Sequence, residues 1–254
     1  MSRQQARQAP ESLDREALGA GAQAAMHGFG RPALAGPFHG RAQLQDPDVR
    51  GSCLGGMVAR TQYYTATSID GFIADRDNSL DWLFQVDSGS GKEDRFSSFF
   101  AGVGAMAMGA TTYEWVLEHE QLLDNPGKWR QSYGAVPCWV FTHRRLPLVP
   151  GADLVQAHGD VRSVHAQMSM AAEGKNIWLA GGGDLAGQFA DHGLLDEIWL
   201  GIAPATLGAG APLLPRRLLA SDLTLAEVEC DGQFVFLAYH LTRREVSRAT
   251  TATG

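Results

Sequence analysis

The sequence predicts an α/β fold in which a twisted, mostly parallel sheet carries helices on both faces and ends in an antiparallel hairpin. Short apolar segments such as 105–108 and 177–180 alternate with segments of helical spacing, which is typical of βαβ units. Near the end of the chain, residues 223–230 and 234–241 are rich in strand-forming residues and are joined by Asp231–Gly232, a strong hairpin signal. Together these patterns predict three layers, with the sheet between two layers of helices.

The individual elements follow from local patterns. Residues 58–67 are β-branched and aromatic and predict a first strand, followed by a turn at Ser68–Gly71 and a short continuation over 72–74. Residues 79–84 predict a short helix capped by Ser79. Residues 128–130 fit either a lid or a solvated loop. The other expected helices cover 93–100, 111–117, 161–173 and 184–191, and the other strands cover 105–108, 138–142, 154–156, 177–180 and 195–203.

The chain divides into three parts by composition. Residues 1–56 are rich in Ala, Gly, Gln and Arg and poor in large apolar side chains, so they cannot bury enough surface to offset the entropy of ordering. We expect a disordered leader there, one domain over 57–245, and a flexible tail over 246–254.

Bulk properties exclude several classes of function. The 254 residues carry a net charge of −7, so the sequence predicts no binding to nucleic acid. No apolar run approaches the roughly 20 residues that span a bilayer, and the first thirty residues lack a secretory signal. The three cysteines form no CxxC pair and the histidines are not at metal-ligand spacing. We therefore expect a cytoplasmic protein with no metal site and no membrane association.

Two strand–turn–helix segments have the pattern of a phosphate site. The first runs from Gly109 into a helix that begins near Thr111 and Thr112, where backbone N–H groups and a hydroxyl suit a phosphate equally with a plain N-cap. In the second, the strand 177–180 enters Gly181, Gly182 and Gly183, followed by Asp184 and Leu185. Three successive glycines lose conformational entropy on folding, which favours a close approach of backbone to a pyrophosphate.

A third segment ends a buried strand with Thr142, His143 and Arg144. These donors suit the ribose 2′-phosphate that distinguishes NADPH from NADH, although a solvated basic turn has the same composition. Ligands of open α/β sheets bind at the carboxyl ends of the strands. Because all three segments lie at such ends, the sequence predicts one extended ligand that carries phosphates.

These motifs resemble the dihydrofolate reductase-like superfamily. The matching features are the turn with Ser68, Asp70 and Gly71, the segment Met108–Glu114, the strand end WVFTHR, and IWLAGGGDLAGQF. Residues 196–210 resemble the DExxL, AP and LGxG signature of its riboflavin-biosynthesis reductase branch. The resemblance covers nearly all of residues 57–245 and implies a dihydrofolate reductase-like sheet of about eight strands.

The resemblance implies NADPH as cofactor. Gly109, Thr111 and Thr112 would then meet phosphates, and Thr142, His143 and Arg144 would surround the 2′-phosphate. The segment Gly181–Leu185 would hold the pyrophosphate, with a cis Gly–Gly bond as one option. Family members usually form homodimers, and the substrate would be a small molecule with a heterocyclic ring or a ribityl chain.

The expected reaction is hydride transfer to a C=N or C=O bond, with the turn at Ser68 and Asp70 facing the nicotinamide. Asp70 and Asp81 are the candidate proton donors, but Asp70 also suits a turn and Asp81 the first turn of a helix. The chain lacks the zinc motif of the bifunctional riboflavin enzyme and the tryptophan-to-acid spacing of dihydrofolate reductase itself. The alternative function is a non-catalytic dimer that keeps the fold and binds a nucleotide or another ligand.

Overall fold

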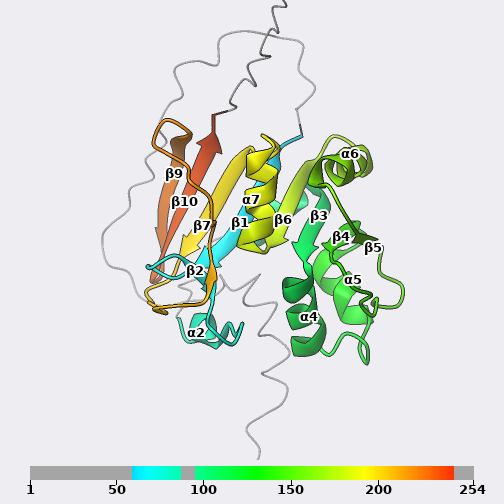
Figure 1. Cartoon of the computed structure of the whole chain (residues 1–254). Helices are drawn as coiled ribbons and strands as arrows, with labels where there is room; N and C mark the ends of the chain where they lie inside the picture. Colours follow the sequence, from blue (N-terminus) through cyan, green and yellow to red (C-terminus); the bar gives the residue numbers. More distant parts are fainter. Residues whose placement is uncertain (1–58, 87–94, 243–254) are drawn as a thin grey trace, which may run out of the picture.

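The computed structural model describes residues 59–86 and 95–242 (Figure 1). The predicted leader, the tail and the start of the predicted helix at 93 lie outside these ranges. The strands of the main sheet are β1 Thr61–Thr67, β3 Val103–Gly109, β4 Cys138–Phe141, β5 Leu154–Ala157, β6 Asn176–Gly181, β7 Glu197–Ile202, β9 Leu223–Asp231 and β10 Phe234–Leu241. They form one sheet in the order β5-β4-β3-β6-β1-β7-β10-β9.

The strand directions confirm the predicted sheet. All neighbours from β5 to β7 are parallel, whereas β10 runs antiparallel to both β7 and β9. The hairpin between β9 and β10 turns at Asp231 and Gly232, and Gly232 has the positive φ of 56° that glycine tolerates best. A separate pair, β2 Phe72–Ala74 with β8 Ala211–Pro212, is antiparallel. β8 is not predicted from the sequence.

Helices cover both faces of the sheet. Their bounds are α2 Asp81–Phe84, α3 Arg95–Ala101, α4 Ala110–His119, α5 Gly127–Tyr133, α6 Val161–Ala171 and α7 Gly183–Asp191. α6 and α7 pack on one face, and α3, α4 and α5 pack on the other. The alternation along β3 makes this division, because Ala105 and Ala107 face the first group while Met106 and Met108 face the second.

Two local expectations need correction. Residues 128–130 are neither lid nor solvated loop, because they lie in α5 and Trp129 is buried against the rings of Tyr113 and Tyr133. The N-cap of α2 is Leu80 rather than Ser79. The Ser79 hydroxyl still accepts a hydrogen bond of 3.0 Å from the backbone N–H of Asp81, so it stabilises the start of the helix from one residue earlier.

Candidate active site

The sheet has a topological switch point between β3 and β6. These strands are parallel neighbours, but β3 leads into α4 on one face and β6 leads into α7 on the other. The two connections therefore diverge at the carboxyl edge of the sheet and leave a crevice between them. The predicted Gly109–Thr112 and Gly181–Asp184 segments are these two connections.

The glycine triplet is shaped by contacts within the protein. A Cβ at Gly181 would lie 2.7 Å from the Thr112 hydroxyl oxygen, and a Cβ at Gly183 would lie 2.8 Å from the carbonyl carbon of Leu213. Gly182 has a φ of 90°, which disfavours any side chain. The sequence predicted that the backbone of the triplet closely approaches a ligand, but in the structure it closely approaches neighbouring segments of the chain. The option of a cis Gly–Gly bond is wrong, since the described residues contain no cis peptide bond.

This packing brings two helix N-termini together. α4 begins after Gly109 and α7 after Gly182, and neither N-cap residue makes a side-chain hydrogen bond to its helix. Unpaired backbone N–H groups and the positive ends of the two helix dipoles therefore face the crevice. The Thr111 side chain is exposed there, and among the described residues its hydroxyl has no hydrogen-bond partner. This end of the crevice is suited to an anion.

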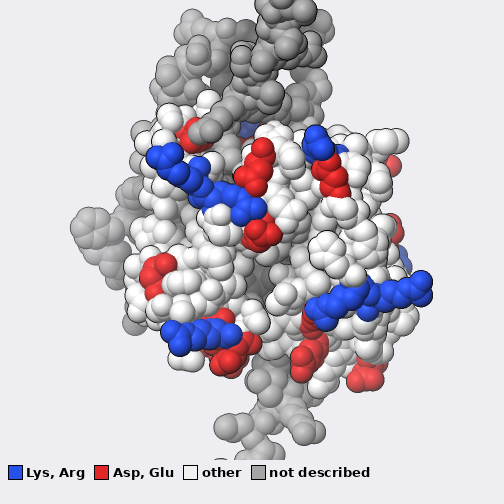
Figure 2. Space-filling view, viewed as in Figure 1, with Lys and Arg blue, Asp and Glu red and all other residues white. Residues whose placement is uncertain are grey.

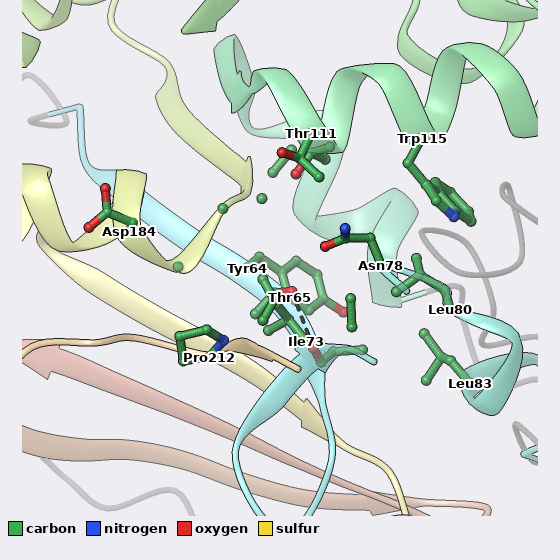
Figure 3. A pocket seen from close by; sticks show the side chains of 18 of the residues that line it. Tyr64, Thr65, Ile73, Asn78, Leu80, Leu83, Thr111, Trp115, Asp184 and Pro212 are labelled. Atoms are coloured by element: carbon green, nitrogen blue, oxygen red, sulfur yellow. Dashed lines mark hydrogen bonds between the residues drawn. The ribbon is translucent and has the colours of Figure 1, made fainter. Parts of the chain in front are cut away.

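The crevice opens into a cavity of about 300 Å³ (Figure 3). Its walls come from β1, the segment from β2 to α2, the starts of α3, α4 and α7, β6 and β8. The lining residues are Tyr64, Thr65, Ala66, Ile73, Ala74, Asn78, Leu80, Leu83, Phe96, Thr111, Thr112, Trp115, Trp178, Ala180, Gly181, Gly182, Gly183, Asp184, Ala211 and Pro212. Figure 3 shows Thr111 and Asp184 toward one end, and Leu80 and Leu83 toward the other.

The end of the cavity around Leu80 and Leu83 is apolar. Ile73 from β2 and the indole of Trp115 from α4 complete its wall. Trp115 stacks on His119 of the same helix, with ring centroids 4.5 Å apart. Phe84 of α2 stacks on the same His119 at 5.6 Å, so the aromatic cluster fixes α2 against α4. Trp82 and Phe84 do not line the cavity.

Asp184 is the one charged side chain among the described lining residues. It lies in the first turn of α7 and pairs with Arg216 at 3.1 Å. A hydrogen bond from Gln188, with the help of Arg216, lowers the pKa of Asp184, so it is ionised at neutral pH. Because its charge is already paired and its side chain is largely exposed, it opposes an anion at the helix N-termini only weakly.

The predicted 2′-phosphate residues lie beside the cavity and do not line it. Thr142 is buried and closes a turn, since its hydroxyl accepts from the Arg144 backbone N–H at 3.1 Å. His143 is exposed, and the Arg144 guanidinium pairs with Glu114 of α4 at 2.6 Å. Figure 2 shows basic and acidic side chains close together on both sides of a hollow in this face. Arg144 is thus held against α4, one helical turn beyond Thr111.

The predicted catalytic residues are not brought into the cavity. The Asp70 carboxylate accepts hydrogen bonds from the Ser68 hydroxyl at 2.6 Å and from the backbone N–H groups of Leu207 and Gly208. These bonds, that of Ser68 foremost, lower the pKa of Asp70. Asp81 is exposed in the first turn of α2. A proton-donor role for Asp70 or Asp81 stays a prediction, and the geometry favours a positioning role for Ser68 and Asp70.

Several lining residues were not singled out from the sequence. The segment between β2 and the end of α2 contributes Asn78, Leu80 and Leu83. This segment folds back over the carboxyl edge of the sheet (Figure 1). Trp115 follows Thr111 and Thr112 by one helical turn, so the helical period alone predicts that it shares their face.

Neither a membrane span nor a metal cluster is found in the described ranges. No helix within them is both long and apolar enough to cross a bilayer. Residues 59–86 and 95–242 also contain no group of three or more His, Cys, Asp or Glu side chains that could hold a metal ion.

Comparisons with known proteins agree with this architecture. The model of the RibD C-terminal domain family matches residues 61–237. The uncharacterized protein YwjB of Bacillus subtilis is 30% identical over 183 residues, which is 72% of this chain and 98% of that protein. YyaP of the same organism is 26% identical over 58% of this chain and 76% of its own length. A crystal structure from Shewanella sp. PV-4, described as a candidate riboflavin biosynthesis protein, is 25% identical and gives a TM-score of 0.57 over 73% of this chain and 100% of its own.

Proposed function

This chain belongs to the RibD C-terminal domain family and has its dihydrofolate reductase-like fold, and on that basis we propose that it is an NADPH-dependent reductase. The substrate would be a small heterocyclic or ribityl-type molecule. The observation that carries the proposal is that two uncapped helix N-termini and an apolar chamber, the end of the cavity around Leu80 and Leu83, belong to one continuous cavity. A dinucleotide has the same two-part character, with charged phosphates and a flat ring.

The residues at the switch point fit the phosphates of the cofactor. The first N–H groups of α4 and α7 and the Thr111 hydroxyl would donate hydrogen bonds to the pyrophosphate. Gly182 and Gly183 both line the cavity at this point. Asp184 and Leu185 would contribute their backbone N–H groups, since the Asp184 carboxylate is turned to Arg216 and the Leu185 side chain is buried in the core.

Arg144 is the residue best placed to select NADPH over NADH. Its pairing with Glu114 holds the guanidinium near the first turns of α4, beside the anion-binding end of the cavity. A 2′-phosphate would compete with the Glu114 carboxylate for the same guanidinium, and Thr142 would keep the turn in shape through its bonds to the Arg144 backbone. His143 would add a second donor from the surface.

The bound cofactor supplies a hydride from its nicotinamide ring. The chain would hold that ring and the substrate together in the apolar chamber, which brings the reacting atoms close to each other. The chamber would also exclude water from the reaction. None of the described carboxyl groups lies at the chamber end of the cavity. We therefore favour a proton delivered by water, with Asp70 and Ser68 shaping the adjacent turn.

The test is a titration of the full chain with NADPH, followed by nicotinamide fluorescence, with NADH as the comparison. Thr111→Val keeps the shape of the side chain and removes the hydroxyl, so NADPH binding should weaken about three- to tenfold, while Thr111→Ser should restore it. A wild-type chain that binds neither nucleotide would exclude the cofactor site.

Selectivity is tested in the same titration. Arg144→Ala should weaken NADPH binding and leave NADH binding unchanged, because only NADPH carries the 2′-phosphate. Arg130→Ala is the matched control, since it removes one exposed positive charge from α5 outside the cavity. Equal losses for both nucleotides in Arg144→Ala would assign Arg144 to folding rather than to recognition.

We also propose that the chain forms a homodimer, following the resemblance to the riboflavin branch. Light scattering coupled to size-exclusion chromatography measures the mass directly. A mass near the 27.3 kDa of a single chain at every concentration tested would contradict this proposal.

A further inference from the structure

The chamber of the cavity has a composition that restricts the substrate. Its described wall consists of the apolar side chains of Ile73, Leu80 and Leu83 and the indole of Trp115. No Lys, Arg or His is among the described residues that line the cavity, and its one charged residue is the acidic Asp184. An anionic group in the chamber would lose its hydration and gain no cation from the described wall in return, which disfavours its binding.

Asn78 is exposed and places one polar group beside this apolar wall. Figure 3 shows its side-chain amide directed into the cavity between Thr111 and Tyr64. Among the described residues the amide has no hydrogen-bond partner, although it offers both a donor and an acceptor. A group of this kind pairs with an adjacent C=O and N–H, such as the lactam edge of a heterocycle.

The backbone holds Asn78 in place. Its φ of 58° lies in the left-handed region, where asparagine is tolerated better than most residues. The carboxylate of Asp75 fixes the turn, since it accepts hydrogen bonds from the backbone N–H groups of Asp77 and Ser79. The Asn78 backbone N–H donates to the Asp75 carbonyl at 3.1 Å. The amide is therefore presented from a preformed turn.

From these observations we infer that the substrate is an uncharged flat ring with a lactam edge, and that Asn78 is the residue that selects it. The inference rests on the proposed reductase function and narrows its substrate class. It separates this chain from enzymes whose substrate carries a phosphate into the chamber. The carboxamide of the nicotinamide has the same edge chemistry, so the test must distinguish the two sources.

The probes are quinazolin-4(3H)-one, quinazoline, which has the same rings without the lactam, and quinazolin-4(3H)-one-6-carboxylate. Each is titrated into the full chain by calorimetry, without nucleotide. The lactam should bind about five- to tenfold more tightly than quinazoline, as expected for one good hydrogen bond. The carboxylate should bind at least about tenfold more weakly than the neutral lactam, because the described wall of the chamber offers no cation.

Asn78→Gly removes the amide and suits the positive φ, so the turn is kept. In this variant the preference for the lactam over quinazoline should disappear. Gln121→Gly is the matched control, because Gln121 is exposed outside the cavity and has a comparable φ of 52°. It should bind all three probes like the wild type.

Four outcomes would overturn the inference. The first is that the neutral lactam does not bind, and the second is that the carboxylate binds as tightly as the neutral lactam. The third is that Asn78→Gly still prefers the lactam over quinazoline. The fourth is that Asn78→Gly loses as much affinity for NADPH as it loses for the lactam. The last would assign the amide to the nicotinamide. Because the probes are measured without nucleotide, failure of NADPH binding in wild type is read separately and bears on the proposed function alone.

Discussion

Replacing Gly183 by alanine tests whether the glycine triplet is required by the protein itself. The added Cβ would lie 2.8 Å from the Leu213 carbonyl carbon and nearer still to the carbonyl oxygens of Pro212 and Leu213. These are backbone atoms and cannot rotate away. Their segment is fixed by two hydrogen bonds, from the Leu213 N–H to the Gly71 carbonyl at 2.8 Å and from the Tyr63 hydroxyl to the Leu213 carbonyl at 3.0 Å.

Relief of the clash would displace this segment and weaken both bonds. At about 1 kcal/mol for each bond, together with strain from overpacking, we expect a loss of about 3 kcal/mol of unfolding free energy. For a domain of this size that corresponds to a fall in Tm of about 6–12 °C. Urea unfolding followed by circular dichroism measures the first quantity, and calorimetry measures the second.

Gly127→Ala is the control for this experiment. Gly127 is the first residue of α5, its φ is not positive, and an added Cβ would meet nothing within 4 Å. Alanine should therefore be neutral or stabilise by up to about 1 kcal/mol. If Gly183→Ala unfolds within about 0.5 kcal/mol of wild type, the packing explanation of the triplet is refuted.

Two other predictions concern the buried and surface carboxylates. Burial alone would raise the pKa of Glu197, but hydrogen bonds from Gln62, Arg60 and Trp199 hold it below its ordinary value; Glu197→Gln should cost about 1–3 kcal/mol at pH 7. A lowered folded-state pKa adds stability above the unfolded pKa of about 4.3, so the difference from wild type should begin to shrink as the pH falls through about 4.3. It should be lost once the pH is below the folded-state pKa of Glu197, and a difference that persists there would contradict the ion pair. Asp70→Asn should speed hydrogen exchange at Leu207 and Gly208, and a change in the pH profile of reduction without this effect would instead support Asp70 as a proton donor.

The sheet could be predicted because its strands carry strong local signals. The segments 105–108 and 177–180 are too apolar for a surface position and too short for a helix, and Asp231–Gly232 marks the hairpin. β8 could not be predicted, since it is two residues long and includes Pro212. α5 was missed because its stability depends on burial of Trp129 against Tyr113 of α4, a tertiary contact that no local pattern records.

The site was predictable only where it follows directly from strand ends. Thr111, Thr112 and the glycine triplet come immediately after β3 and β6, and strand order then brings them together. The chamber depends instead on the return of the segment after β2 over the carboxyl edge of the sheet. The sequence Asp75–Asn78 predicts only a loop there and does not predict this return. Asp70 was placed near the substrate by resemblance, whereas its hydrogen bonds commit it to the loop at Leu207.

The glycine triplet therefore cannot by itself separate a reductase from a binding module that has lost its chemistry. Gly181 and Gly183 are required by close contacts inside the protein and Gly182 by its positive φ, so all three would persist without a ligand. Thr111 and Asn78 differ, because within the described residues neither side chain has a hydrogen-bond partner although both face the cavity. Loss of binding on removing these two polar groups, in chains that fold normally, is the result that a purely structural cavity would not give.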